Sequence, residues 1–441
     1  MKLYSTRNRD HVVSFAEAVD TAMAPDGGLY MPCELPPLPP EFLEEWAKGS
    51  FQEIALNMAR HLLNDEIPDD ALEQIVHEAL NFPVPVQELD NDLSVLELFH
   101  GPTLAFKDFG ARFMARVLAW LHRDDSREVT VLVATSGDTG GAVASGFAGV
   151  KGVRVVLLYP GGRVSPLQEL QLTTAGENIT TLKVDGTFDD CQRLVKQAFA
   201  DGELAEKRTL TSANSINIAR LLPQMFYYAA AWARVNVEDR AGGEDRPSGR
   251  GVVFVVPSGN FGNLTAGLMA AEMGIPVERF VMATNINDVV PDYFRTGTYR
   301  PRRAERTLSS AMDVGDPSNL ARIRSLFDED LEAMRRRIHT DSSTDEETRE
   351  ATREAFSQYR YVFDPHGAVG YGAARRFLDM KQTDGRAVVL ATAHPAKFPE
   401  AMDEEMRSAV RVPEVLREIA TRPKKMVPIS ADYEEFRSHL A

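Results

Sequence analysis

Several short runs of β-branched and other apolar residues recur along the chain, and each ends in a turn. They read VTVLVATSGDTGG from Val129, VRVVLLYPGG from Val153, VVFVVPSGNFG from Val252 and AVVLATAHP from Ala387. Most of these turns contain glycine, and alanine-rich segments compatible with a helix follow them. Continuous apolar strands that alternate with helices are typical of parallel sheets buried on both faces. The pattern therefore predicts an α/β protein with mainly parallel sheets.

The amino-terminal segment follows a different pattern. A proline cluster, CELPPLPPEF from Cys33, precedes FQEIALNMARHLLN from Phe51, whose apolar residues recur at helical spacing. We therefore predict a mostly helical domain over residues 1–90. Much further on, Thr344 stands three positions before Glu347, the spacing of a capping box that opens a helix.

The length of 441 residues favours more than one packed unit. We predict two open α/β lobes around a cleft: a large lobe from residues 91–119 and 229–441, and a smaller lobe from residues 120–228. The polar stretch NVEDRAGGEDRPSGRG, which starts at Asn236, is interpreted as a surface connection between the two halves.

Charge and cysteine content narrow the class of function. The formal net charge of −16 opposes general binding to nucleic acid or to anionic membrane surfaces. Cys33 and Cys191 are far apart and show no metal-binding spacing, so we expect neither a disulfide framework nor a metal site. The amino terminus lacks an apolar export signal, and no apolar run is long enough for a membrane span. We expect a cytoplasmic protein, and nothing in the sequence predicts its oligomeric state.

Two turns at strand-to-helix junctions are candidate anion sites. PSGNFGN, residues 257–263, has the glycines and amides that allow backbone N–H groups to surround a phosphate, although an ordinary tight turn fits as well. It lacks both the GKS or GKT ending of a nucleotide loop and the dinucleotide glycine spacing. ATSGDTGG, residues 134–141, places hydroxyl groups and Asp138 at another such junction, where a structural turn is the alternative.

Apart from these two turns, a further candidate anion site lies in SANSINIAR, residues 212–220. Its serines and asparagines fit a helix cap, but Arg220 beside hydroxyl and amide groups also suits capture of a phosphate or carboxylate. Near the carboxyl terminus, ATAHPAKF places Thr392 and His394 at a strand end. A histidine in this setting is more often a satisfied hydrogen-bonding residue than a catalyst.

Lys107 lies between Phe106 and Asp108 in ELFHGPTLAFKDF. A lysine in an apolar run is usually a strand-end or helix-start residue whose charge reaches water. The sequence contains no H-E-x-x-H zinc motif and no G-x-S-x-G nucleophile motif. A lysine with a separate phosphate loop is the minimum equipment for pyridoxal phosphate, because the amine forms a Schiff base with the aldehyde. Phe106 and its neighbours are expected to lower the pKa of the lysine by excluding water.

Motifs along nearly the whole chain resemble the threonine synthase family, within the tryptophan-synthase-β-like (fold type II) group of pyridoxal-phosphate enzymes. In order, they are YSTR, SFAEAV, APDGGLYMP, ELFHGPTLAFKDFG, ATSGDTGGAVA, SANSINIAR, PSGNFGNLTAG, ATNINDVVP, DPHGAVG and TAHPAKF. Their joint occurrence in this order is far more specific than any one of them.

The resemblance implies a role for each candidate residue. Lys107 is expected to carry pyridoxal 5′-phosphate, Thr392 to meet the pyridine nitrogen, and Asp138 to lie near the 3′-oxygen. The cofactor phosphate is assigned to Gly259, Asn260, Phe261, Gly262 and Asn263. The substrate phosphate is assigned to Thr135, Thr139, Asn214, Ser215 and Arg220.

The implied reaction converts O-phospho-L-homoserine and water to L-threonine and phosphate by γ-elimination and β-hydration, with Lys107 moving protons. This is a carbon–oxygen lyase of threonine biosynthesis. Two alternatives stay open from the residues alone. One is a related enzyme of β-chemistry, such as a serine or threonine dehydratase or a cysteine synthase, whose substrate has no γ-phosphate. The other is a non-catalytic sensor of a phosphorylated metabolite.

Overall fold

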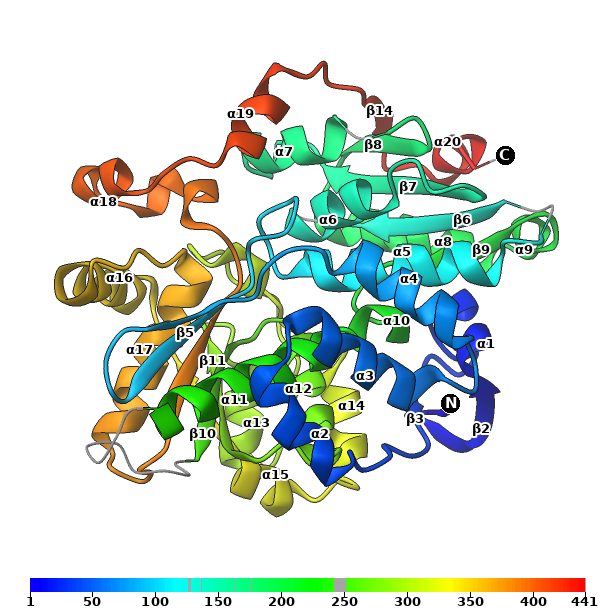
Figure 1. Ribbon diagram of the computed structural model, residues 1–441. Helices are drawn as coiled ribbons and strands as arrows, with labels where there is room; N and C mark the ends of the chain where they lie inside the picture. Colours follow the sequence, from blue (N-terminus) through cyan, green and yellow to red (C-terminus); the bar gives the residue numbers. More distant parts are fainter. Residues whose placement is uncertain (126–127, 136, 163, 175, 242–250, 441) are drawn as a thin grey trace.

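The structure is a computed structural model that describes residues 1–125, 128–135, 137–162, 164–174, 176–241 and 251–440. Two sheets of mainly parallel strands, one above the other in Figure 1, form the two lobes. An amino-terminal unit packs beside them. The two expected α/β lobes are therefore confirmed. Most of the expected surface connection falls on residues 242–250, outside the described residues, as does Ser136 of the ATSGDTGG turn.

The large lobe contains a sheet in the order β12-β11-β10-β13-β5-β4. Its strands are β4 (Val86–Glu88), β5 (Leu93–Glu97), β10 (Val252–Pro257), β11 (Val277–Thr284), β12 (Ile338–Ser342) and β13 (Arg386–Ala391). All neighbours pair in parallel except β4 and β5. Every residue of β10 and β13 is buried, as the continuous apolar runs predicted.

Helices cover this sheet on both faces (Figure 1). They are α11 (Gln224–Ala241), α12 (Gly262–Glu272), α13 (Val289–Thr296), α14 (Leu320–Leu326), α15 (Leu331–Arg337), α16 (Asp345–Tyr359), α17 (Pro365–Asp379) and α18 (Glu404–Ala409). Helix α16 opens with the predicted capping box, because the Thr344 side chain accepts from the N–H of Glu347 while the Glu347 side chain accepts from that of Thr344.

The small lobe contains a fully parallel sheet in the order β14-β8-β7-β6-β9. Its strands are β6 (Val129–Ala134), β7 (Val153–Pro160), β8 (Ile179–Asp185), β9 (Thr209–Ser212) and β14 (Val427–Ser430). The helices of this lobe are α6 (Asp138–Phe147), α7 (Pro166–Thr173), α8 (Phe188–Ala200), α9 (Gly202–Lys207), α10 (Ile218–Leu221), α19 (Glu414–Thr421) and α20 (Tyr433–Ser438).

Strand β14 corrects the predicted lobe division, which assigned the whole carboxyl-terminal region to the large lobe. The chain leaves the large lobe after α18, crosses to α19 and adds β14 to the free edge of β8 (Figure 1). Ile429 and Phe436 are buried in the core of the small lobe. Burial of these apolar side chains favours the placement of β14 in the small lobe. The four-residue strand itself carries no signal for which sheet it joins.

The amino-terminal unit contains the expected helices α1 (Phe15–Thr21), α2 (Pro40–Glu45), α3 (Phe51–Leu63) and α4 (Asp69–Ala79). It also contains an antiparallel sheet in the order β2-β1-β3, made of β1 (Lys2–Ser5), β2 (Asn8–Ser14) and β3 (Tyr30–Pro32), which the sequence did not predict. Strand β4, inside the predicted 1–90 domain, pairs with β5 of the large sheet instead. One apolar core continues from Leu3 through Phe109 and Val131 to Phe254, so the units pack as one body.

Helix α5 (Lys107–Leu121) links all three units, and His122 at its carboxyl end fixes it to the amino-terminal unit. His122 Nε2 lies 2.8 Å from Asp20 Oδ1, and Nδ1 lies 2.7 Å from Asp125 Oδ2. The hydrogen bond to Asp20, aided by Asp125 and opposed by partial burial, raises the pKa of His122 to about 9. Both ring nitrogens therefore donate at neutral pH.

We predict a pH-dependent loss of stability at His122. A raised folded-state pKa stabilises the protein fully below the ordinary histidine value of 6.5, and this contribution disappears as pH rises through about 9. Denaturant unfolding of the parent protein and His122→Gln should therefore give free energies of unfolding that differ most below about pH 6 and converge above about pH 9. A difference that stays constant across this range would contradict the assignment.

Candidate active site

Lys107 is the first residue of α5, at the end of the loop that follows β5. We call the buried region around Lys107, Asp138 and Arg220 the crevice. Backbone contacts fix this loop to the TAHPAKF segment after β13. The N–H of Phe106 donates to the carbonyl of Thr392 at 2.8 Å, and the N–H of His394 donates to the carbonyl of Leu104 at 3.0 Å. Lys107 therefore lies at a helix start, one of the two usual locations of such a lysine, but this helix begins inside the protein.

The environment of Lys107 disfavours its charged form. Burial is the main cause that lowers its pKa to about 8; the charge of Asp138 opposes this shift, and those of Lys397 and Arg220 contribute to it. The side chain keeps some accessible surface, although it lies deep enough for this desolvation. Its location at a helix amino terminus also disfavours a cation. In the described part of the chain its amine has no hydrogen bond or ion pair, and the Phe106 ring centroid lies 5.9 Å away.

Asp138, at the start of α6 in the small lobe, forms an ion pair with Lys397 of the large lobe. Lys397 Nζ lies 2.6 Å from Asp138 Oδ1, and the two side chains are 0% and 4% exposed. Gln168 Nε2 donates to the same oxygen at 3.1 Å. Burial alone raises the pKa of Asp138, but Lys397 and then Lys107 outweigh it and hold the pKa well below its usual range. The carboxylate is therefore ionised and already paired.

Sequence reasoning missed Lys397, and a short element carries it. The 3₁₀ turn Pro395–Lys397 follows His394, whose Nδ1 accepts from the N–H of Ala396 at 3.1 Å. Lys397 Nζ also donates to the carbonyl of Thr103 at 3.0 Å. The available signal was a lysine inside the matching TAHPAKF motif. No spacing rule connects it to an aspartate 259 positions away.

The PSGNFGN turn connects β10 to α12 and presents backbone N–H groups. Phe261 has a left-handed backbone with φ of 62°, and α12 begins at Gly262. The first N–H groups of a helix have no partner within it, so Gly262 and Asn263 offer donors to an anion. A Cβ at Gly259 would lie 2.7 Å from the carbonyl oxygen of Ala311, so the close backbone approach requires glycine.

The side chain of Asn260 connects this turn to SANSINIAR, the candidate anion segment of residues 212–220. Its Nδ2 donates to Ser215 Oγ at 2.6 Å and to Ser318 Oγ at 2.9 Å, and its Oδ1 accepts from the N–H of Ser318 at 2.7 Å. The two phosphate-type loops predicted separately are thus neighbours. Ser318 was not singled out from the sequence.

Asn263 points away from the turn toward two buried tyrosines. Its Oδ1 accepts from Tyr227 at 2.6 Å and from Tyr228 at 2.8 Å, whereas its Nδ2 is buried without a partner. The Tyr227 ring packs edge-on against Phe109 at 5.1 Å between centroids. Phe109 is two residues from Lys107, so this stack sets the distance between the lysine helix and the turn.

Arg220 is a buried cation without a carboxylate partner among the described residues. Burial lowers its pKa to about 10, Nη1 donates to the carbonyl of Ala213, and Nε has no partner. Gly110 of α5 permits its approach, since a Cβ there would lie 2.8 Å from Arg220 Nε. An unpaired buried guanidinium is a site for an anion.

The polar residues assigned to the same anion site are engaged to different extents. Thr135 uses its full hydrogen-bonding capacity in its own turn, with Gly137 and Gly140 as partners. Asn214 donates to the carbonyl of Ala134 at 3.0 Å. Thr139 lies partly exposed in the first turn of α6.

The histidines in the matching motifs have structural partners. Besides capping the 3₁₀ turn, His394 packs edge-on against Phe99 at 5.2 Å, and burial lowers its pKa to about 4, so it is neutral. His366 Nδ1 lies 2.5 Å from Asp364 Oδ2, and its Nε2 accepts from the N–H of Ala311 at 3.1 Å. His394 thus fits the hydrogen-bonding alternative stated for it from the sequence, and His366 also has hydrogen-bond partners at both ring nitrogens.

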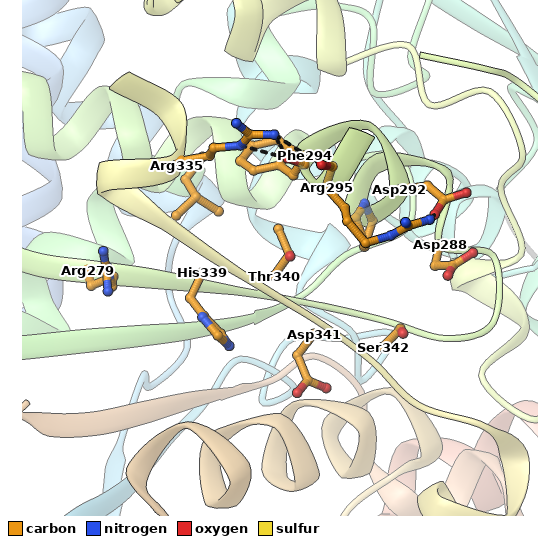
Figure 2. Close-up of a pocket in the computed structure, with 12 residues that line it drawn as sticks. Arg279, Asp288, Asp292, Phe294, Arg295, Arg335, His339, Thr340, Asp341 and Ser342 are labelled. Atoms are coloured by element: carbon orange, nitrogen blue, oxygen red, sulfur yellow. Dashed lines mark hydrogen bonds and ion pairs between the residues drawn. The ribbon is translucent and has the colours of Figure 1, made fainter. Parts of the chain in front are cut away.

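A separate cavity of about 410 Å³ lies at the outer edge of the large sheet, and none of the crevice residues named above lines it. Figure 2 shows it along β12, with Arg335 against the carbonyl of Phe294 and Arg295 beside Asp292. Asp288 and Asp341, also in its wall, pair with arginines outside it. Most of its charges are thus neutralised locally, so we place the chemistry in the crevice.

Within the described residues, no cluster of histidine, cysteine and carboxylate side chains could hold a metal ion. Over the same residues, every helix is too short or too polar to cross a bilayer.

Three family models match the chain. They are described as "Pyridoxal-phosphate dependent enzyme" over residues 80–393, "Threonine synthase N terminus" over residues 2–80 and "Threonine synthase, C-terminal" over residues 367–440. A threonine synthase of Serratia marcescens is 43% identical over 440 residues, covering 100% of this chain and 99% of that protein.

Solved structures agree over the same length. The crystal structure of threonine synthase from Escherichia coli is 42% identical, with a TM-score of 0.88 and coverage of 100% of this chain and 99% of that one. The structure of pyridoxal-phosphate-bound threonine synthase from Brucella melitensis is 34% identical, with a TM-score of 0.89 and coverage of 100% and 98%.

We predict that the Lys107 amine titrates near pH 8 in the protein without added ligands, well below the ordinary lysine value of 10.5. Desolvation is the main cause, and the nearby cations add to it. Competitive labelling with a trace acylating reagent across this pH range, read by mass spectrometry of the Lys107 peptide, measures the titration. Exposed Lys151 serves as the internal reference, and a Lys107 titration that coincides with that of Lys151 would refute the assignment.

Proposed function

Because the chain belongs to the threonine synthase family of pyridoxal-phosphate enzymes, we propose a role for each crevice residue in converting O-phospho-L-homoserine and water to L-threonine and phosphate. The observation that supports this most directly is the proximity of an easily deprotonated amine and a buried guanidinium that has no carboxylate partner among the described residues. Lys107 has a lowered pKa, and Arg220 is buried beside it without a carboxylate partner. An amine suits the cofactor aldehyde, and a guanidinium suits a phosphate.

The residues present fit pyridoxal 5′-phosphate. Lys107 offers the amine, and the backbone from Gly259 to Asn263 offers N–H donors for the cofactor phosphate. The buried hydroxyl of Thr392 is our candidate for the pyridine nitrogen. When bound, the cofactor supplies an aldehyde for the lysine and a conjugated ring that accepts electrons from the substrate.

The second anion site fits the phosphate of the substrate. We assign the charge to Arg220, with Ser215, Asn214 and Thr139 as polar contacts and Thr135 shaping the turn. The overall charge of −16 makes such local cations necessary for a phosphorylated substrate. Holding the phosphate also stabilises the charge that develops on it as the γ-bond breaks.

Lys107 is the group assigned to proton transfer. Once its amine is free of the cofactor, a pKa near neutrality suits it to take the Cα proton and to return protons later. Phe106 and the apolar wall of the crevice exclude water during these transfers. Enzymes of β-chemistry need the lysine and the cofactor loop but not Arg220, because their substrates carry no γ-phosphate.

We also propose that the protein acts in the cytoplasm on a small-molecule substrate, without nucleic acid or membrane. Its two cysteines, exposed Cys33 and buried Cys191, are both free thiols, which suits a reducing compartment.

We predict that purified protein with pyridoxal phosphate releases phosphate and L-threonine in equal amounts from O-phospho-L-homoserine. Lys107→Ala should lose the visible absorbance of the lysine-bound cofactor and at least about 10³-fold in kcat, since it removes both the attachment and the proton carrier. Lys151→Ala, in an exposed turn, is the matched control and should keep both. Phosphate released with a keto acid in place of threonine would instead indicate a side elimination.

We predict that Arg220→Met raises the KM for O-phospho-L-homoserine roughly 10- to 150-fold, because one hydrogen bond to a charged group is worth about 1.5–3 kcal/mol. Cofactor absorbance should persist. Steady-state kinetics separates KM from kcat, and Arg295→Met in the outer cavity provides the matched arginine control. An unchanged KM in Arg220→Met would count against a γ-phosphate substrate and in favour of the β-chemistry alternative.

A further inference from the structure

The buried carboxylate of Asp138 lies within electrostatic reach of two lysines, Lys107 and Lys397. An ionised carboxylate in a protein interior needs a cation, because an unpaired buried charge is costly. Either lysine could supply that charge. The structure gives the contact to Lys397, with 2.6 Å between Nζ and Oδ1.

The residues around Lys397 favour its pairing with Asp138. The carbonyl of Thr103 accepts a second hydrogen bond from Nζ at 3.0 Å. Thr103 is itself fixed, because its N–H and hydroxyl donate to buried Asp108 at 2.9 and 2.7 Å. Gln168 of the small lobe donates a hydrogen bond from Nε2 to Asp138 Oδ1. Lys397 is thus positioned as a cation by two acceptors, whereas Lys107 has no such acceptor among the described residues.

We propose that Lys397 is the dedicated counter-ion of Asp138, and that by filling this role it leaves the Lys107 amine free to react. The inference rests on the proposed role of Lys107 in attaching the cofactor. Without Lys397, the nearest remaining cation for Asp138 is Lys107, and the resulting ion pair would hold Lys107 as an unreactive ammonium. Lys397 is therefore a positioning residue for the nucleophile.

The other charges near these groups point the same way. Lys107 is influenced by Asp138 of α6, Lys397 of the 3₁₀ turn and Arg220 of α10. Asp138 is influenced by Lys397, Lys107 and, from α17, His366. Asp108, the other buried carboxylate here, accepts hydrogen bonds from Thr103, and burial raises its pKa to about 6. Asp138 is therefore the carboxylate whose charge favours the ammonium form of Lys107, and Lys397 and Arg220 oppose it. Because Asp138 and Lys397 belong to different lobes, the arrangement exists only when the two lobes are together.

The test compares the titration of Lys107 in the cofactor-free parent protein and four variants by the competitive labelling described above. Lys397→Met keeps the length of the side chain but removes its charge. It should raise the apparent pKa of Lys107 by at least about one unit, so that the reactive fraction near pH 8 falls roughly tenfold. Lys397→Arg keeps the charge and should keep the low pKa. In Lys397→Met with Asp138→Asn, the low pKa should return, because no carboxylate remains to hold the ammonium.

Asp138→Asn alone keeps the inference falsifiable if Lys397→Met does not fold. It removes the carboxylate whose charge raises the pKa of Lys107, so this pKa should fall below that of the parent protein. The proposal is overturned if Lys107 titrates alike in the parent and Lys397→Met, or alike in Lys397→Met and the double variant. It is equally overturned if Asp138→Asn leaves the titration unchanged.

A general loss of packing would not depend on Asp138, so a rescue by the second substitution separates this role from a structural one. The result is also independent of the proposed function. Failure of that function would appear as cofactor attachment or turnover in Lys107→Ala, whereas this titration is measured without cofactor or substrate.

Discussion

The ion pair of Lys397 and Asp138 is the interaction on which the crevice depends, because it settles where buried charge resides between the two lobes. The protein places Lys107, Lys397 and Arg220 in a desolvated region with Asp138 as the nearby paired carboxylate. The two remaining cations, Lys107 and Arg220, must then either lose a proton or bind an anion from outside the protein. Lysine can lose a proton near neutral pH and arginine cannot. The same constraint supports the proposed roles of Lys107 as an amine and of Arg220 as a phosphate-binding residue.

The fold supplies this arrangement by joining the carboxyl ends of two parallel sheets, the usual location of ligand sites in open α/β folds. Segments distant in sequence are fixed to one another by backbone contacts, as between Phe106 and Thr392. The fully buried Arg322 connects the amino-terminal unit to these segments in the same way. Its guanidinium donates to the carbonyls of Tyr30, Ser215 and Ile216 at 3.0, 3.2 and 2.6 Å. The amino-terminal sheet thus helps to hold the segment assigned to the substrate phosphate.

Local patterns predicted much of this structure because their physical causes are local. The buried strands β10 and β13, the capping box at Thr344 and the strand-to-helix turn at Phe261 each follow from a short stretch of residues. The partner of Asp138, the sheet that β14 joins and the antiparallel amino-terminal sheet depend on contacts between distant segments. No short-range spacing encodes those contacts, so Lys397, Ser318 and Arg322 were not found from the sequence.

By itself, the sequence determined the α/β class and the motifs of the family, and it predicted Lys107 as the reactive amine, since each depends on residue types in a continuous stretch. It also indicated two anion-binding segments in a protein of net negative charge. The tertiary structure alone decided that these segments touch through Asn260 and that Asp138 is paired with Lys397 rather than Lys107. The physical reason is that a pKa depends on distances and desolvation, which exist only after the chain has folded.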